Sequence, residues 1–464
     1  MMKCLKIPAM KNISFSMLFL FMKINEKMIF ASILVIYIAI LILRPFELDE
    51  SLHILTGKMI LNRTLDPFSS HYLNPFRYTF GSPLVPIIYG FFYLIGGFVL
   101  TRIVSLFFVF STLILTYDLS KMLFNKKIAN ISLILACVSK TTILLATESL
   151  LDSVGVFFFF SALYLLYKKK PFYSGLFLGL AVLSKFIVII PVVALILYLY
   201  KKGFRPIKVL IGLSILIVPF FIYDIEVLTT LYHFFISTHL PADVLMHLTY
   251  FLKEFSFTVP IPFLLYLIYH KKSFIKDNYL LIIPFLSIFF FHIVTLNYVS
   301  IHHSMPYGLV PLSVLSGKII SSMTKRRQLL FLAIAVILNL IVVFDYVTVM
   351  PSYSSIIDDI RKLDGIILAY NPNIIHLIKG TDLNDEYIYN FFYFDFNSDG
   401  KSTKDDYEEA MKNNFFDYII IPPKYIIEPQ YSELLDLVPK YYCEYKTSTG
   451  LRSRMTIYSE CISR

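Results

Sequence analysis

Apolar runs of nearly twenty residues recur along most of this chain, separated by short polar turns. The clearest are 28–44, 99–119, 128–146, 206–222 and 329–347. A membrane-spanning helix needs about 20 mainly apolar residues, because only helices and closed barrels satisfy their backbone groups inside a bilayer. Hydrophobic residues make up 57% of the 464 residues, against roughly 45–50% in a soluble domain. The pattern predicts a mainly α, polytopic membrane bundle of about eleven spans.

Three segments depart from a simple span. The run 84–97 is apolar but is interrupted by a proline and three glycines, which predicts a re-entrant or interfacial segment. The run 172–200 divides into two short helices that meet near Lys185. Between the first two spans, the apolar residues of 51–61 have the spacing of a helix that lies along the membrane surface.

Clusters of basic residues fix the predicted orientation. They occur at 121–127, 168–170, 201–202, 271–272 and 325–327, and they fall on alternate turns. Because lysine and arginine concentrate in cytoplasmic loops, these turns and the N-terminus are expected inside the cell and the C-terminal tail outside. The net charge of +10 therefore reflects membrane topology, and we expect membrane lipid rather than nucleic acid as its partner.

The chain divides into three predicted parts. Residues 1–27 form a lysine-bearing cytoplasmic lead-in, 28–347 the transmembrane domain with an external loop at 46–82, and 348–464 a small extracytoplasmic α/β domain. From residue 346 onward there are 12 basic and 18 acidic residues, a net −6, against 30 basic and 14 acidic before it, a net +16. The sequence of the tail predicts two buried strands, a helix and a hairpin. Its cysteines, Cys443 and Cys461, would be able to pair outside the cell.

The predicted topology places a set of ionisable residues together. Charged groups within a membrane body are costly and mark functional sites by default. All of the following fall at helix ends or in loops on the external face: Asp49, Glu50, Arg77, Arg102, Glu148, Asp152, Lys185, His302 and His303. Their one-sided distribution favours a shared cavity that opens outward over ordinary membrane anchors.

Five short motifs follow one another in a recognisable order. They are Leu48-Asp49-Glu50-Ser51-Leu52-His53, Phe80-Gly81-Ser82-Pro83-Leu84, Glu148-Ser149-Leu150-Leu151-Asp152, Gly179-Leu180-Ala181-Val182-Leu183-Ser184-Lys185 and His302-His303-Ser304-Met305-Pro306. This ordered set, over roughly 28–345, resembles the GT-C superfamily of polyprenyl-phosphate-sugar glycosyltransferases, which includes protein O-mannosyltransferases and the aminoarabinose transferase of lipid A. One departure is clear: where the family commonly has Arg-Tyr before the late proline, this chain has His302-His303.

The resemblance implies a GT-C-like bundle and transfer of a sugar from a polyprenyl or dolichyl phosphate to a protein, lipid or glycan acceptor outside the cell. Such transfer needs a base for the acceptor hydroxyl and positive groups for the phosphate. The implied base is Asp49, with Glu50 and Asp152 as further acidic residues of the catalytic site. The candidate substrate-binding residues are Arg77, Arg102, Glu148, Lys185, His302 and His303.

A tail segment offers a candidate metal site. Asp395, Asn397, Asp399 and Asp406 have the spacing of an EF-hand-type calcium loop, with Gly400 at its sixth position. The twelfth position holds aspartate rather than the longer glutamate, and the preceding residues are typical of a strand rather than a helix. A turn that leads into a capped helix is therefore favoured over a divalent-metal site, and no cofactor is required by the sequence.

The alternative function is a transporter or lipid flippase whose charged residues line a path. Transporters usually carry repeated halves with paired broken helices, and no such duplication is evident in this sequence. One outward cavity would favour the enzyme, whereas a polar path that reaches both faces would favour transport.

Overall fold

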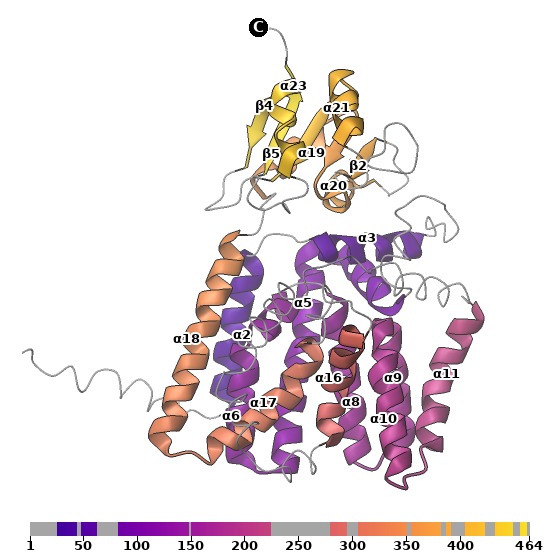
Figure 1. The fold of residues 1–464 in the computed structure, drawn as a ribbon, viewed down its shortest axis with the longest axis vertical. Coiled ribbons are helices and arrows are strands. Elements are labelled where there is room, and N and C mark those ends of the chain that lie inside the picture. Colours follow the sequence, from indigo (N-terminus) through magenta and orange to yellow (C-terminus); the bar gives the residue numbers. More distant parts are fainter. Residues whose placement is uncertain are drawn as a thin grey trace, which may run out of the picture.

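The structure is a computed structural model that describes residues 26–43, 48–62, 82–147, 150–223, 279–294, 305–349, 354–381, 387–390, 404–422, 432–448 and 455–461. It contains a helical bundle and, above one end of it, a small domain built around a sheet (Figure 1). The prediction of a mainly α fold with a small C-terminal α/β domain is confirmed at this level.

The bundle follows the predicted runs closely. Its helices are α2 (Glu26–Leu43), α3 (Leu48–Asn62), α5 (Leu84–Leu123), α6 (Lys126–Val138), α7 (Lys140–Thr147), α8 (Leu151–Tyr167), α9 (Pro171–Ser184), α10 (Ile189–Lys201), α11 (Ile207–Tyr223), α16 (Tyr279–Val294), α17 (Met305–Ser321) and α18 (Lys325–Val349). The region between α11 and α16, residues 224–278, lies outside the described residues. Helix α5 breaks at Gly96 and Gly97, whose backbones are non-helical. A re-entrant or interfacial position for 84–97 remains a prediction.

Helix α3 lies across the end of the bundle, beneath the C-terminal domain (Figure 1), and most of its residues are buried there. Its position along a membrane surface remains a prediction. Helix α3 crosses α5 at two glycines. A Cβ added to Gly57 would lie 1.7 Å from the Pro86 carbonyl oxygen, and one added to Gly90 would lie 2.3 Å from the Gly57 carbonyl carbon. Only glycine at both positions allows the two backbones to approach so closely, and this approach fixes the height of α3 above the bundle.

The outer surface of the bundle is apolar. Large hydrophobic side chains are exposed on α2, α5, α10, α11 and α18, including Val35, Phe107, Leu197, Ile211 and Ile337. Soluble monomers rarely expose apolar surface on this scale, so a lipid environment explains it. By length and composition, α5 alone among the described helices would cross a membrane, and α6 with α7, bent by 62°, would form a second span. The count of eleven spans remains a prediction.

The C-terminal domain contains a five-stranded sheet of order β2-β1-β3-β5-β4. Its strands are β1 (Ile367–Ala369), β2 (Ile388–Asn390), β3 (Tyr418–Ile421), β4 (Tyr442–Thr447) and β5 (Thr456–Glu460). Strand β1 is parallel to β2 and β3, and β5 is antiparallel to β3 and β4. Both predicted strands, the hairpin and the helix α21 (Lys404–Lys412) are present, whereas β2 was not predicted. Cys443 and Cys461 form a disulfide.

Helix α20 (Pro372–Lys379) attaches this domain to the bundle. At its start, the Ser51 hydroxyl of α3 donates to the Asn371 side-chain oxygen at 3.3 Å. At its end, Lys58 Nζ donates to the carbonyls of Gly380 and Thr381 at 3.2 and 3.3 Å. A lysine ammonium at a helix C-terminus satisfies carbonyls that have no partner within the helix. The domain is therefore held over α3, directly above the motif that begins at Leu48.

Candidate active site

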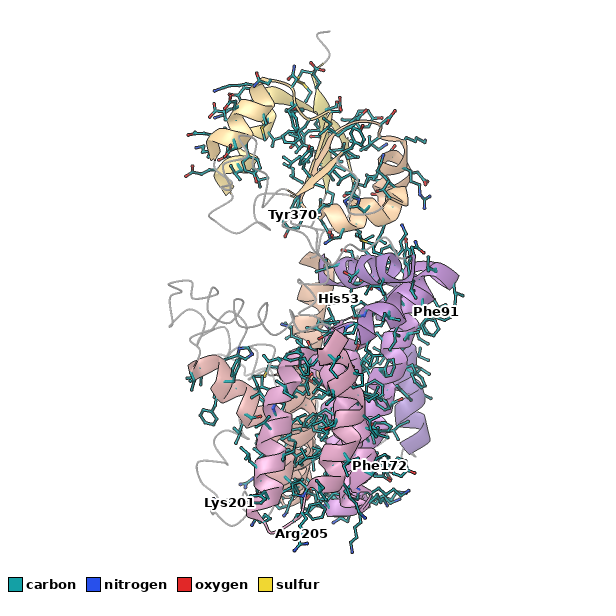
Figure 2. All side chains as sticks on the ribbon, turned by 90° about the vertical axis from the view of Figure 1, so that its right-hand side faces the viewer. His53, Phe91, Phe172, Lys201, Arg205 and Tyr370 are labelled. Atoms are coloured by element: carbon teal, nitrogen blue, oxygen red, sulfur yellow. A yellow bond between two sulfur atoms is a disulfide. The ribbon has the colours of Figure 1, made fainter. Side chains whose placement is uncertain are left out.

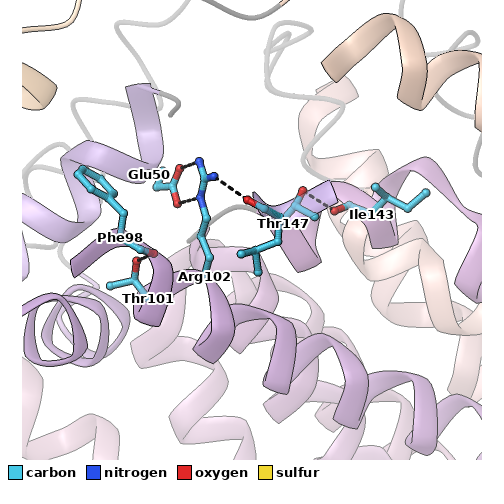
Figure 3. A network of polar contacts seen from close by, with 7 residues as sticks. Glu50, Phe98, Thr101, Arg102, Ile143 and Thr147 are labelled. Carbon is cyan, nitrogen blue, oxygen red and sulfur yellow. Dashed lines mark hydrogen bonds and ion pairs between the residues drawn. The ribbon is translucent and has the colours of Figure 1, made fainter. Parts of the chain in front are cut away.

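Glu50 and Arg102 form a buried ion pair at the first turn of α3. Arg102 Nε and Nη2 donate to the two carboxylate oxygens of Glu50 at 2.7 and 2.6 Å, and Nη1 donates to the Leu41 carbonyl at 3.2 Å. The side chains are 4% and 0% exposed. Figure 3 shows the guanidinium between Glu50 and the end of α7 at Thr147. The pair therefore joins α3, α5 and the end of α2, in the bidentate geometry that makes such bonds strong.

Asp152 and Lys185 form a second buried ion pair. Lys185 Nζ donates to Asp152 Oδ2 at 2.6 Å, with both side chains 8% exposed. Asp152 lies in the first turn of α8, and Lys185 occupies the break where α9 ends and a 3-10 turn, Phe186–Val188, begins. The Phe186 amide donates to the Ser82 hydroxyl at 2.8 Å, so the predicted break near Lys185 is confirmed. Ser82 holds the backbone of this break and thereby positions Lys185.

Tyr89 lies between the two ion pairs. Its hydroxyl donates to the Leu150 carbonyl at 3.0 Å and lies 2.7 Å from the Ser153 hydroxyl. The carboxylates of Glu50 and Asp152 both act electrostatically on this hydroxyl. Residues that are distant in sequence therefore form one polar region under α3. Sequence reasoning missed Tyr89, because an isolated tyrosine in an apolar run has no distinguishing spacing.

His53 of α3 adds an imidazole to this region. It is 7% exposed, and its Nδ1 has no hydrogen-bond partner within the described part of the chain. Burial, and then the nearby charge of Lys185, lower the pKa of His53 to about 3. The imidazole is therefore neutral at physiological pH. His53 belongs to the first motif, but it was not predicted as a site residue.

This burial predicts a pH-dependent stability. Because the folded pKa lies below the unfolded value of about 6.5, the stability contributed by neutral His53 is complete above pH 6.5 and is lost as the pH falls toward 3. Near pH 5 the loss is about 2 kcal/mol. Thermal unfolding in detergent should therefore show a smaller decrease in Tm from pH 7 to pH 5 for His53→Gln than for the wild type. An equal decrease in Tm from pH 7 to pH 5 for the variant and the wild type would contradict a buried, neutral imidazole.

The structure tests the other predicted residues only in part. Asp49 is the second residue of α3, one helical turn before His53, and its side chain lies outside the described part of the structure. Arg77, Glu148, His302 and His303 also lie outside it. So do Asp395, Asn397 and Asp399, while Asp406 is buried in the first turn of α21. Among the described residues, no group of three or more histidine, cysteine, aspartate or glutamate side chains has a metal-binding arrangement.

Comparison with known proteins identifies the fold. No protein-family model and no curated protein sequence matches the chain. The solved structures include ArnT from Cupriavidus metallidurans bound to undecaprenyl phosphate, with a TM-score of 0.57, 13% identity, and 97% of this chain and 99% of that chain covered. The apo state of the same protein gives 0.59 at 13% identity, covering 96% and 98%.

A second similar structure is the Archaeoglobus fulgidus oligosaccharyltransferase in complex with zinc and sulfate. Its TM-score is 0.52 at 14% identity, with 92% of this chain and 73% of that chain covered. Both similar proteins are GT-C enzymes. The predicted GT-C-like fold is therefore confirmed over nearly the whole chain, including the C-terminal domain.

Proposed function

We propose that this protein is a membrane glycosyltransferase that moves a sugar from a polyprenyl or dolichyl phosphate to a protein, lipid or glycan acceptor on the extracytoplasmic side. One observation carries the proposal: a buried lysine–aspartate pair lies beneath a surface helix that begins with adjacent acids, within a fold shared with ArnT bound to undecaprenyl phosphate. A lysine at that position is suited to hold a lipid-linked phosphate.

The proposed chemistry is a single displacement. The acceptor oxygen forms a bond to the anomeric carbon as the bond from that carbon to the phosphate oxygen breaks. The electron pair of the broken bond leaves with the polyprenyl phosphate, and Asp49 takes the acceptor's proton as general base. Lys185 stabilises the charge that gathers on the departing phosphate. Glu50 and Arg102 hold α3 in place, because their two-bond ion pair joins the first turn of α3 to α5.

Two observations support the proposed orientation. The Cys443–Cys461 disulfide is typical of a domain outside the reducing cytosol. The basic turn at 201–205 lies at the far end of the bundle from that domain: Figure 2 labels Lys201 and Arg205 there, with His53 at the opposite end and Tyr370 above it. Positive charge at the lower end and the disulfide at the upper end agree with an extracytoplasmic site.

The packing of the described core also favours an enzyme over a transporter. Phe159, Phe160, Leu163, Leu178 and Val182 are fully buried against one another. They lie further along α8, or earlier on α9, than the Asp152–Lys185 pair. A polar path that continued from this pair between α8 and α9 would have to pass through this apolar cluster.

Replacing Lys185 with alanine tests the phosphate contact. We expect binding of a lipid-phosphate sugar to weaken about 10- to 100-fold, because a bond to a charged group is lost. The variant should be made with and without Asp152→Asn, since breaking one side of a buried pair is destabilising in itself. Transfer of a radiolabelled sugar by the purified protein, followed for the variants and for Lys168→Ala at the opposite end, measures the effect.

The outcomes separate the two candidate functions. The control Lys168→Ala should bind and transfer as the wild type does. A wild type that neither transfers nor hydrolyses any lipid-phosphate sugar would contradict the enzyme. Movement of lipid or solute across vesicles would then support the transporter instead.

A further inference from the structure

Tyr307, near the start of α17, has a buried hydroxyl that its ring packing does not require. The residue is 0% exposed, and its hydroxyl has no hydrogen-bond partner within the residues that the structure describes. Its ring packs edge-on against Phe159, with 6.2 Å between the centroids. A phenylalanine would make the same ring contact without burying a polar group, and burying such a group unpaired costs free energy. We therefore expect the hydroxyl to have a hydrogen-bond partner in another state of the protein.

The hydroxyl is inserted beside the Asp152–Lys185 pair. A Cβ added to Gly155 would lie 2.9 Å from the Tyr307 hydroxyl, 3.7 Å from Ser184 Cβ and 3.8 Å from Lys185 Cβ. Gly155 follows Asp152 by three residues on α8, one helical turn away, and the Asp152 charge acts on the hydroxyl. Because Gly155 has no side chain, α8 leaves room for the Tyr307 hydroxyl of α17 next to this ion pair.

The proposed function creates a need for such a group. Lys185 Nζ is bonded to Asp152 at 2.6 Å, and in the proposed scheme the donor's phosphate draws the ammonium away from that carboxylate. A carboxylate that loses its lysine inside the protein is strongly destabilised unless another donor replaces it. A tyrosine hydroxyl is a donor that pairs well with a carboxylate.

We propose that Tyr307 is a positioning residue that donates its hydroxyl to Asp152 when the donor's phosphate takes Lys185. Tyr307 makes no contact with the substrate in this scheme. It lowers the cost of separating Asp152 from Lys185 and so makes the lysine available to the phosphate. The inference rests on the proposed function, because it presupposes a phosphate at Lys185.

The test is binding of undecaprenyl phosphate to the purified full-length chain in detergent. Tyr307→Phe should weaken binding about tenfold, since a hydrogen bond to a charged group is lost in the bound state only. Its ligand-free Tm should be equal to that of the wild type or higher, because the unpaired hydroxyl is removed. Tyr37→Phe is the matched control. The Tyr37 hydroxyl donates to the Cys137 carbonyl, so this variant should lose Tm and keep its affinity for the lipid.

A second arm separates positioning from direct contact. In an Asp152→Asn background the carboxylate charge is absent, so adding Tyr307→Phe should change the affinity little. An equal loss of affinity in both backgrounds would overturn the inference, and so would wild-type affinity in Tyr307→Phe. A wild type that does not bind undecaprenyl phosphate would overturn the proposed function and this inference together. If the wild type binds undecaprenyl phosphate and Tyr307→Phe binds it with the same affinity, the inference is overturned and the proposed function is not.

Discussion

Asp49→Asn should lower the rate of sugar transfer by about 10²–10⁴-fold while the lipid-phosphate sugar still binds. Asparagine keeps the size and polarity of the side chain but cannot take the acceptor's proton. Asp49 lies in the first turn of α3, beside Glu50 and one turn before His53, on the helix that covers the Asp152–Lys185 pair. Transfer and binding are measured separately, by single-turnover transfer and by equilibrium binding of the donor.

The control for this variant is Asp364→Asn, an exposed carboxylate of the C-terminal domain, which should leave transfer unchanged. Near-normal transfer by Asp49→Asn together with loss of transfer in Asp152→Asn, in a protein that still folds, would assign the base to Asp152. Near-normal transfer by all of these variants would argue against a glycosyl-transfer site and in favour of the transporter.

The architecture was predictable because it follows from local patterns of polarity. Apolar runs set the helices, and the two-helix division near Lys185 appears in the structure as α9, a 3-10 turn and α10. The apolar spacing of 51–61 predicted a helix, whereas the burial of α3 on nearly all sides beneath the C-terminal domain is a property of tertiary structure. In the tail, short apolar runs bounded by turn residues indicated β1, β3 and the hairpin, whereas β2, Ile388–Asn390, has one aliphatic residue and forms no such run.

The partners within the site could not be predicted, because pairing is a property of tertiary structure. Sequence analysis named Arg102 as a candidate substrate-binding residue and Glu50 as an acidic residue of the catalytic site. That the two residues, 52 positions apart, bond to each other appears only in the structure. Lys185 and Asp152, 33 positions apart, were predicted separately as site residues, and their direct contact appears only in the structure. Tyr307 gave no signal at all, since a tyrosine in an apolar helix is usually part of the core.

The Glu50–Arg102 pair should be the most sensitive structural contact of the site. Arg102→Met removes the charge partner of a carboxylate at 0% exposure, and Glu50→Leu removes the charge partner of a guanidinium at 4% exposure. Breaking one side of a buried pair typically costs about 3–5 kcal/mol, a large share of the roughly 5–15 kcal/mol that stabilises a folded domain. Each single variant should therefore lose much of its yield as a monodisperse protein, and its Tm in detergent should fall sharply.

The double variant Glu50→Leu/Arg102→Met should recover most of that loss, because replacing a whole buried pair with apolar residues is often close to neutral. The matched control is the exposed pair Asp358–Arg361, at 3.0 Å with side chains 82% and 60% exposed, where Arg361→Met should change Tm little. An Arg102→Met protein that keeps the wild-type Tm but no longer binds the lipid phosphate would contradict a structural role of the pair. Arg102 would then be the phosphate contact that its position in the sequence predicts, and its bond to Glu50 would be a resting arrangement that the substrate replaces.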